Sequence, residues 1–206
     1  MAYIGFFPVS LGFKALKFKQ KTITKKTETA SGRTVRATNA TTLWQGVLAF
    51  PSTAAGDFRA VQAFVARCQG SLNEFDLVVP TISDTSGSYP SQVTFPSAAS
   101  TAAGSTSIAV TSDQTSKTIL RAGDVIRFFN HTKVYMVTED ATTDGAGAGT
   151  IQFQPALVTA VDSDSAGEPI SVNQVAFRFI ISNDLQEYGY DNQGFVSFEI
   201  DVQEVY

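Results

Sequence analysis

Residue types that build active sites and metal centres are scarce in this 206-residue chain, which contains one cysteine, Cys68, and one histidine, His131. A single cysteine excludes a disulfide within the chain and a metal site built from several cysteines. A single histidine excludes a zinc site built from several histidines. No apolar run reaches 18 residues, so no membrane span is expected. The first residues lack the basic and long apolar regions of a secretory signal, so we expect the chain to accumulate in the cytoplasm of the cell that makes it.

The abundant residue types favour β-structure. Hydrophobic residues make up 43% of the chain and charged residues 17%, which is the balance of a globular protein. Phenylalanine occurs 16 times, and the β-branched residues threonine and valine are common, whereas the helix-favouring glutamate and lysine are sparse. A chain of this length holds either one large β domain or two small ones. The composition therefore predicts a mainly-β protein.

Charge is divided unevenly along the chain. Residues 1–80 hold ten Lys and Arg against four Asp and Glu, which gives a net charge of +6. Residues 81–206 hold five against fifteen, a net charge of −10, and the two parts sum to −4. A basic part and an acidic part fit complementary faces of neighbouring subunits as readily as they fit a nucleic-acid partner.

The first part of the chain predicts a β-hairpin over about residues 14–38. Alternation over Leu16–Thr22 places lysines on one face of the first strand and apolar side chains on the other. A polar, turn-prone segment covers residues 25–32, and residues 33–38 are predicted to form the returning strand. A separate strand is predicted over residues 41–50, with large apolar side chains on one face: Trp44, Leu48 and Phe50.

Basic side chains gather on this hairpin, and three interpretations of them are open. They would contact phosphates in a nucleic-acid partner, discourage unwanted pairing at a strand edge, or bind an acidic neighbouring subunit. No aromatic residues alternate with the lysines on their face, so a platform for base stacking is not expected. We predict an interface made by Lys17, Lys19, Lys21, Lys25, Lys26, Arg33 and Arg36.

One helix is predicted, over residues 57–69, because apolar residues recur there at helical spacing. Asp57 is expected to cap its start or to favour the positive end of its dipole, and Gly70 to end it in a left-handed conformation. Cys68 lies on the apolar stripe, which predicts a buried structural thiol. The stripe consists of Phe58, Val61, Phe64, Val65 and Cys68.

A change in composition after residue 80 indicates a second module. Residues 81–118 are rich in Ser, Thr, Ala and Gly, and several short predicted strands follow. Longer strands return at residues 174–182 and 194–202 and are expected to pair with the N-terminal strands. We therefore predict a discontinuous β-sandwich domain over residues 1–80 and 168–206. A small β-barrel-like domain over residues 97–161 is inserted into it, with linkers at 81–96 and 162–167.

Candidate sites for chemistry are weak. His131 lies at a predicted hairpin turn, and no Gly-x-Ser-x-Gly motif presents a nucleophile. The glycine-rich run 144–149 leads into a strand, whereas a phosphate-binding loop leads into a helix. Asp162, Asp164 and Glu168 lack the glycine and terminal glutamate of a calcium-binding loop, so a solvated acidic loop is favoured. We expect no enzyme, no cofactor and no metal.

The order of motifs between residues 31 and 80 resembles the belt region of the distal tail proteins of tailed bacteriophages, the baseplate hub subunits at the end of the tail tube. That family has, in this order, a glycine-x-arginine strand, a tryptophan strand, and a helix that ends in glycine followed by phenylalanine. The chain's opening residues 7–13 resemble the family's start, and residues 103–157 resemble a small β module that recurs in phage structural proteins. The motifs in this chain are Ser31-Gly32-Arg33-Thr34-Val35-Arg36, Leu43-Trp44-Gln45-Gly46-Val47-Leu48, Gly70 and Phe75-Asp76-Leu77.

The resemblance implies a structural virion protein that forms a ring, usually of six subunits, between the tail tube and the baseplate hub and tip. Its partners would be further copies of itself, the tube protein and the hub or tip proteins, and DNA would pass through the lumen without being read. A tail tube protein is one alternative, and it would polymerise into long stacks. A receptor- or carbohydrate-binding module in the inserted domain is another, with candidate aromatic side chains Tyr89, Phe128, Phe129 and Tyr135.

Overall fold

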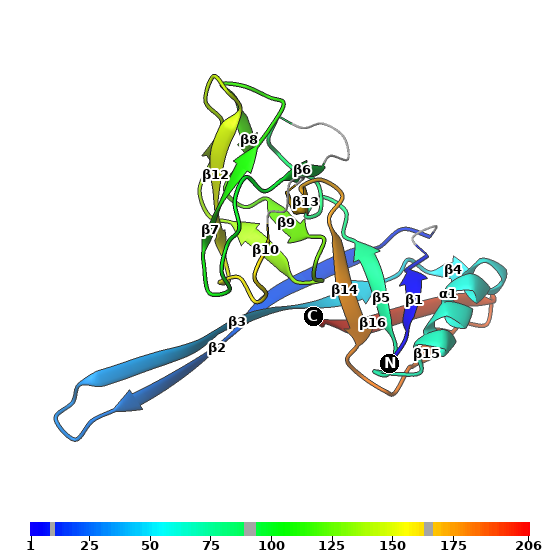
Figure 1. The fold of residues 1–206 in the computed structure, drawn as a ribbon. Coiled ribbons are helices and arrows are strands. Elements are labelled where there is room, and N and C mark those ends of the chain that lie inside the picture. Colours follow the sequence, from blue (N-terminus) through cyan, green and yellow to red (C-terminus); the bar gives the residue numbers. More distant parts are fainter. Residues whose placement is uncertain (9–10, 89–93, 163–166) are drawn as a thin grey trace. The chain divides into compact units, whose positions relative to one another are not determined.

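The computed structural model describes residues 1–8, 11–88, 94–162 and 167–206 (Figure 1). Within these ranges it contains sixteen strands and one helix, so the mainly-β class predicted from the sequence is confirmed. The chain divides into two compact units. Unit 1 consists of Met1–Leu77 and Arg178–Val205, and unit 2 consists of Val78–Phe177 with Tyr206.

Unit 1 is built on an eight-stranded sheet. Its main path runs in the order β1, β5, β14, β16, β3, β2, and the short strands β4 and β15 both pair with β16. β1 is parallel to β5, whereas the β14–β16, β16–β3 and β3–β2 pairs are antiparallel. The strands are β1 (Tyr3–Phe6), β2 (Ala15–Glu28), β3 (Thr34–Ala49), β4 (Thr53–Ala54), β5 (Glu74–Val78), β14 (Ala176–Ile181), β15 (Tyr188–Tyr190) and β16 (Phe195–Glu204).

Helix α1 (Ala55–Cys68) packs its apolar stripe against the sheet, and all five predicted stripe residues are buried. The ring of Phe58 lies 5.3 Å from that of Phe198 on β16, and the ring of Phe64 lies 5.6 Å from that of Phe75 on β5. These edge-to-face contacts join the helix to two strands that are far apart in the sequence.

Both ends of α1 agree only in part with the sequence prediction. The helix starts after Ala54, which makes no side-chain cap hydrogen bond, so Asp57 is not the cap but lies in the first turn, the position of its alternative predicted role at the positive end of the dipole. At the other end Gln69 adopts the left-handed conformation (φ 52°) before Gly70 does (φ 65°). Glycine is favoured at position 70, because the positive φ strains other residues and a Cβ atom there would lie 2.5 Å from Asp184 Oδ1, which would have to move.

The strands β3 and β16 alternate between a buried and an outward face. Trp44, Leu48 and Phe50 are buried, as the sequence predicts. Gly46 lies on the same face, and the ring of Phe18 fills the space beside it, since a Cβ atom on Gly46 would lie 3.2 Å from Phe18 Cζ.

The β2–β3 hairpin is longer than the sequence predicts. The strands pair from Ala15 opposite Ala49 to Glu28 opposite Thr34, so the predicted returning strand 33–38 and the predicted separate strand 41–50 are one continuous strand. Lys25 and Lys26 lie in β2 and not in a turn. From the pair Thr22–Thr42 to the pair Thr24–Thr38, β2 advances by two residues and β3 by four. This irregularity interrupts the alternating pattern without ending the strand.

Unit 2 contains a six-stranded sheet in the order β6, β13, β9, β10, β12, β7 and a two-stranded sheet of β8 and β11. None of these sheets closes into a barrel. Among the described residues, an isolated bridge between Ser97, next to β6, and Val110 in β7 links the two edges, so the expected barrel-like closure is incomplete. The strands are β6 (Thr94–Pro96), β7 (Ser107–Thr111), β8 (Thr118–Leu120), β9 (Val125–Phe128), β10 (Val134–Val137), β11 (Ala141–Thr142), β12 (Ala148–Gln154) and β13 (Pro169–Ser171).

The segments predicted as linkers contribute to unit 2 wherever they are described. Ser83 is fully buried, and its hydroxyl donates to the Val175 carbonyl oxygen (2.7 Å) and accepts the Val79 N–H (2.8 Å). β6 pairs with β13, which in turn pairs with β9, so residues 168–177 belong to unit 2 and not to the first domain. A polar segment can be a structural part of a domain when buried hydrogen bonds hold it there.

Candidate interface

The part of the β2–β3 hairpin that lies beyond the β16 pairing is here called the arm (residues 20–43). The backbone pairing between β16 and β3 ends at Gln45, which lies opposite Lys19, so among the described strands those of the arm pair only with each other. All residues from Lys19 to Ala37 are exposed. Figure 1 shows the arm, in blue and cyan, extending past the other strands of the sheet of unit 1.

The tip of the arm is a tight turn held by its own polar groups. The Thr29 N–H donates to the Arg33 carbonyl oxygen (2.9 Å), and the Arg33 N–H donates back to Thr29 Oγ1 (3.1 Å). Gly32 provides the positive φ (77°) that this reversal needs. The reversal of the chain is therefore encoded locally, and it does not depend on contact with the rest of the subunit.

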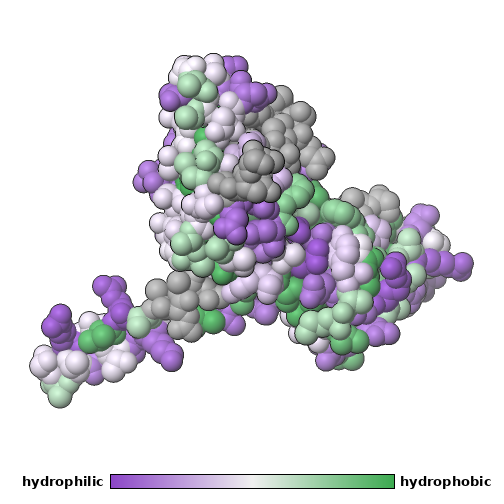
Figure 2. All heavy atoms as spheres, in the orientation of Figure 1, coloured by the Kyte–Doolittle hydropathy of each residue, from purple (hydrophilic) through white to green (hydrophobic). Residues whose placement is uncertain are grey.

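Positive charge dominates the arm. It contains five basic residues and one acidic residue, Glu28, which gives a net charge of +4. Figure 2 shows hydrophilic residues over much of its distal end, with apolar surface between them. Two apolar residues of the arm are well exposed, Ile23 at 41% and Val35 at 52%. None of the basic side chains forms an ion pair within the part of the chain that the structure describes: Lys21, Lys25, Lys26, Arg33 and Arg36.

The register corrects the prediction that the lysines form a single face. Alternation places Lys25 on the same face as Lys21, whereas Lys26 points to the opposite face. There Lys26 lies directly opposite Arg36. Like charges opposite each other on neighbouring strands destabilise a sheet, so this pair does not help the arm to fold.

A hollow on unit 1, here called the acidic groove, gathers unpaired carboxylates. It has a volume of about 510 Å³. Glu199 and Asp201 point outward from β16, and Glu187 joins them from the segment before β15. All three are exposed, and none forms an ion pair with a described residue. The other lining residues include one cation, Lys14, and the largely exposed Leu185.

A second charged cluster in unit 1 is already saturated. The Arg178 guanidinium donates to both carboxylate oxygens of Asp76 (2.6 and 3.2 Å) and to Glu74 (3.3 Å), and it lies 4.1 Å from the centre of the Tyr3 ring. Burial alone would lower the pKa of Arg178, but the two carboxylates outweigh it and raise that pKa. The cluster ties β1, β5 and β14 together and leaves no free group for chemistry.

His131 lies in the turn between β9 and β10, as predicted, and belongs to a structural chain of hydrogen bonds. The Val158 N–H donates to the Tyr135 hydroxyl oxygen (3.1 Å), and that hydroxyl lies 2.7 Å from His131 Nε2. His131 Nδ1 contacts Asn130 Oδ1. Burial, with the nearby charges of Arg127 and Lys133, lowers the pKa of His131 to about 4. The neutral tautomer with its proton on Nδ1 satisfies every bond in the chain.

The aromatic candidates for a carbohydrate site do not form a common surface. Phe128 and Tyr135 are fully buried, and their rings pack against each other at 5.5 Å. Phe129 is 63% exposed, whereas Tyr89 lies outside the described residues. Two of the four candidates therefore have a packing role.

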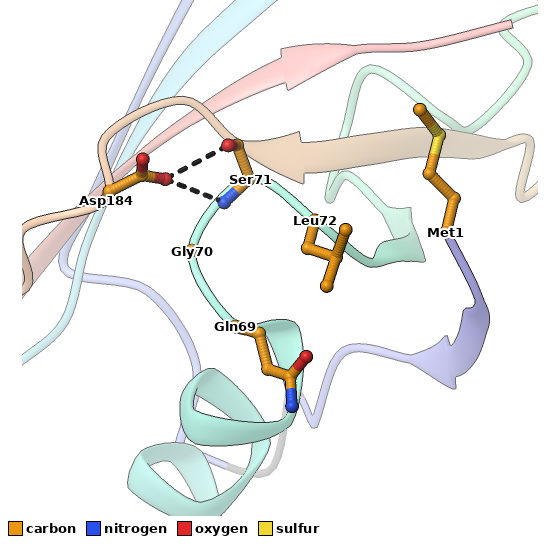
Figure 3. Close-up of a pocket in the computed structure, with 6 residues that line it drawn as sticks. All are labelled: Met1, Gln69, Gly70, Ser71, Leu72 and Asp184. Carbon is orange, nitrogen blue, oxygen red and sulfur yellow. Dashed lines mark hydrogen bonds between the residues drawn. The ribbon is translucent and has the colours of Figure 1, made fainter.

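A pocket beside the end of α1 (Figure 3) holds a polar contact that the sequence does not reveal. Asp184 Oδ1 accepts hydrogen bonds from the N–H and the hydroxyl of Ser71, both at 3.0 Å. The pocket has a volume of about 440 Å³, and its other lining residues are Met1, Gln69, Gly70 and Leu72. Its one carboxylate is engaged in holding the loop after the helix.

The remaining motifs have structural roles. Asp144 Oδ1 accepts the N–H groups of Ala146 and Ala148 (2.8 and 2.9 Å), so the glycine-rich run forms the turn into β12. Cys68 is buried, which raises the pKa of its thiol to about 11. Asp164 lies outside the described residues, and within the described ones no three metal-binding side chains come together. The only helix of the described ranges, α1, has 14 residues and is too short to cross a membrane.

Two features of unit 1 thus carry charged side chains that form no ion pair with a described residue, the basic arm and the acidic groove. The sequence indicated the arm's charge, whereas the groove combines a strand and a distant connection and had no local signal. Neither a scan against protein-family models nor a search of curated proteins found a match to this chain.

Proposed function

We propose that this chain is a structural subunit of a bacteriophage tail and forms a ring, usually of six copies, that joins the tail tube to the baseplate hub and tip. Its partners are further copies of itself, the tube protein and the hub or tip proteins. DNA passes through the lumen of the ring without being read. The protein is made in the host cytoplasm and ends in the tail of the virion. The motif order between residues 31 and 80 supports this proposal.

The observation that carries the proposal is the exposed arm. An isolated two-stranded hairpin is marginally stable in water, and beyond Gln45 no other described strand pairs with this one. Its repeated β-branched residues favour an extended strand that has no core of its own to cover. Such a segment is expected to gain stability from contact with another subunit. A ring results when a heterologous contact of this kind closes on itself.

The test is to measure the mass of the purified protein by light scattering and to image it by negative stain. We expect closed rings of about six copies. Long filaments would favour a tail tube protein, and a persistent monomer at all concentrations would overturn the proposal. A matched variant lacks residues 22–42 and joins Lys21 to Leu43, which lie opposite each other, through Asn-Gly, a sequence suited to a two-residue hairpin turn. It is expected to fold but to remain a monomer.

A further inference from the structure

The basic arm and the acidic groove belong to the same unit and carry opposite charges, which form no ion pairs with described residues. We infer that the arm of one copy binds in the acidic groove of the next copy around the ring. The inference rests on the proposed function, because it identifies the contact through which that ring would form. It assigns the arm a protein partner rather than a nucleic acid.

Charge and apolar surface match on the two sides. The arm carries a net charge of +4, and the groove is lined by three carboxylates and one ammonium, a net charge of −2. Opposite potentials on two surfaces guide their encounter and fix their relative register. Apolar surface is present on both sides as well, from Ile23 and Val35 on the arm and from Leu185, 76% exposed, beside the groove. Burial of such side chains adds affinity to the match of charge.

The arm's own groove is out of reach. Asp201 in the groove pairs with Val47, which in turn pairs with Lys17, so the groove lies at the base of the same hairpin. Lys25 is eight residues beyond Lys17 along β2, so the two residues are separated by about 26 Å at roughly 3.3 Å per residue of strand. A paired ribbon cannot fold back over this distance without breaking its ladder. The partner groove must therefore come from another copy.

The arm–groove contact gives the Lys26–Arg36 pair a role in assembly. Two cations opposite each other weaken the arm in the free subunit. A carboxylate from the neighbouring groove would relieve their repulsion, so binding and ordering of the arm would be coupled. Because the arm and the groove are different surfaces, each copy uses one of each, which is the geometry that closes into a ring.

The decisive experiment exchanges charges between the two surfaces in the full chain. One variant carries Lys25→Glu and Arg36→Glu, and the other carries Glu187→Lys and Glu199→Lys. Each alone is expected to shift the protein concentration for half-assembly upward by roughly 10- to 100-fold, because like charges then face each other. An equimolar mixture is expected to recover assembly in which the reversed arms bind the reversed grooves. Asp84→Lys with Glu139→Lys, two exposed sites of unit 2 that do not line the groove, is the matched control and is expected to assemble normally.

The outcomes separate the two proposals. If the unaltered chain forms rings and either reversed variant assembles as well as it does, the arm–groove contact is wrong and the ring proposal stands. If the unaltered chain never assembles, the ring proposal fails and this contact fails with it. Carbodiimide coupling, which joins lysines to carboxylates in contact, gives a second readout in the unaltered ring. Mass spectrometry is expected to find arm lysines coupled to Glu187, Glu199 or Asp201 of another copy, and their absence from coupled dimers would overturn the contact.

Discussion

At the scale of single residues, the buried polar groups of this protein have structural roles, and the hydrogen bonds of His131 show how such a role depends on protonation. Its ring stacks on Phe128 with 5.5 Å between centroids and lies 2.7 Å from the Tyr135 hydroxyl. The hydroxyl in turn holds the Val158 N–H. The neutral imidazole is therefore the form that the fold requires.

Acid is expected to weaken the fold through this residue. The pKa of His131 falls from 6.5 to about 4 on folding, so between these values the unfolded chain binds the proton and the folded one does not. The contribution to stability is complete above pH 6.5 and is lost as the pH falls towards 4. Because the ring is partly exposed and solvent screens part of the effect, the contribution is on the order of 1–2 kcal/mol.

Denaturant unfolding at several pH values checks this expectation. His131→Gln, which does not titrate, is expected to have a flatter dependence between pH 6.5 and 4 than the unaltered chain. Carboxylates that titrate in both proteins cancel in the comparison. Equal slopes in this window would contradict a role for His131 protonation.

At the scale of secondary-structure elements, the arm shows a conflict between stability and assembly. Replacing Arg36 by Glu puts a carboxylate opposite Lys26 and turns a repulsive cross-strand pair into an attractive one. We expect the free subunit's arm to gain about 0.5–1 kcal/mol while assembly becomes weaker. Hydrogen exchange of the β2–β3 amides measures the first effect and light scattering the second. Arg59→Glu, on the exposed side of α1, is the control for the change of charge. If Arg36→Glu weakened assembly without slowing hydrogen exchange in the arm, the repulsion between Lys26 and Arg36 would be contradicted.

Elements with a buried, regular pattern were predictable from the sequence. The α1 stripe is buried as predicted, and the strand predicted at residues 174–182 buries one alternating face, because burial leaves a period of 3.6 or 2 in the sequence. That face consists of Val175, Phe177, Phe179 and Ile181. The full length of the hairpin was not predictable, because the described side chains of the arm are mostly polar and exposed and so leave no such period. Its basic residues were recognised from charge alone, and their division between two faces required the register.

Polar networks and long-range pairings account for the other differences. The Asp124 carboxylate accepts hydrogen bonds from the Thr85 hydroxyl (2.7 Å) and from the N–H and hydroxyl of Ser86 (2.9 and 2.7 Å). These bonds fix a segment that composition alone identifies as a linker. The parallel β1–β5 pair and the acidic groove likewise join residues that are far apart in the chain. No local pattern specifies which distant partner a polar residue meets.

At the scale of the whole molecule, the two units differ in how the chain builds them. Unit 1 needs both ends of the chain, whereas unit 2 is almost entirely the continuous segment Val78–Phe177. That segment has its own core, with fully buried Ile126, Phe128, Tyr135 and Phe153 among its members. A continuous segment with its own core meets the requirements for independent folding.

We therefore expect residues 78–177 expressed alone to fold and to unfold in one cooperative thermal transition. Calorimetry and the dispersion of amide signals in a nuclear magnetic resonance spectrum provide the measurement. The control is the same segment with Phe128→Ala, which is expected to lose about 3–5 kcal/mol because it opens a cavity in this core. A fragment without a cooperative transition would mean that unit 2 depends on the strands of unit 1. Unit 2 would then fold only together with unit 1, and the two units would not have separate free energies of unfolding.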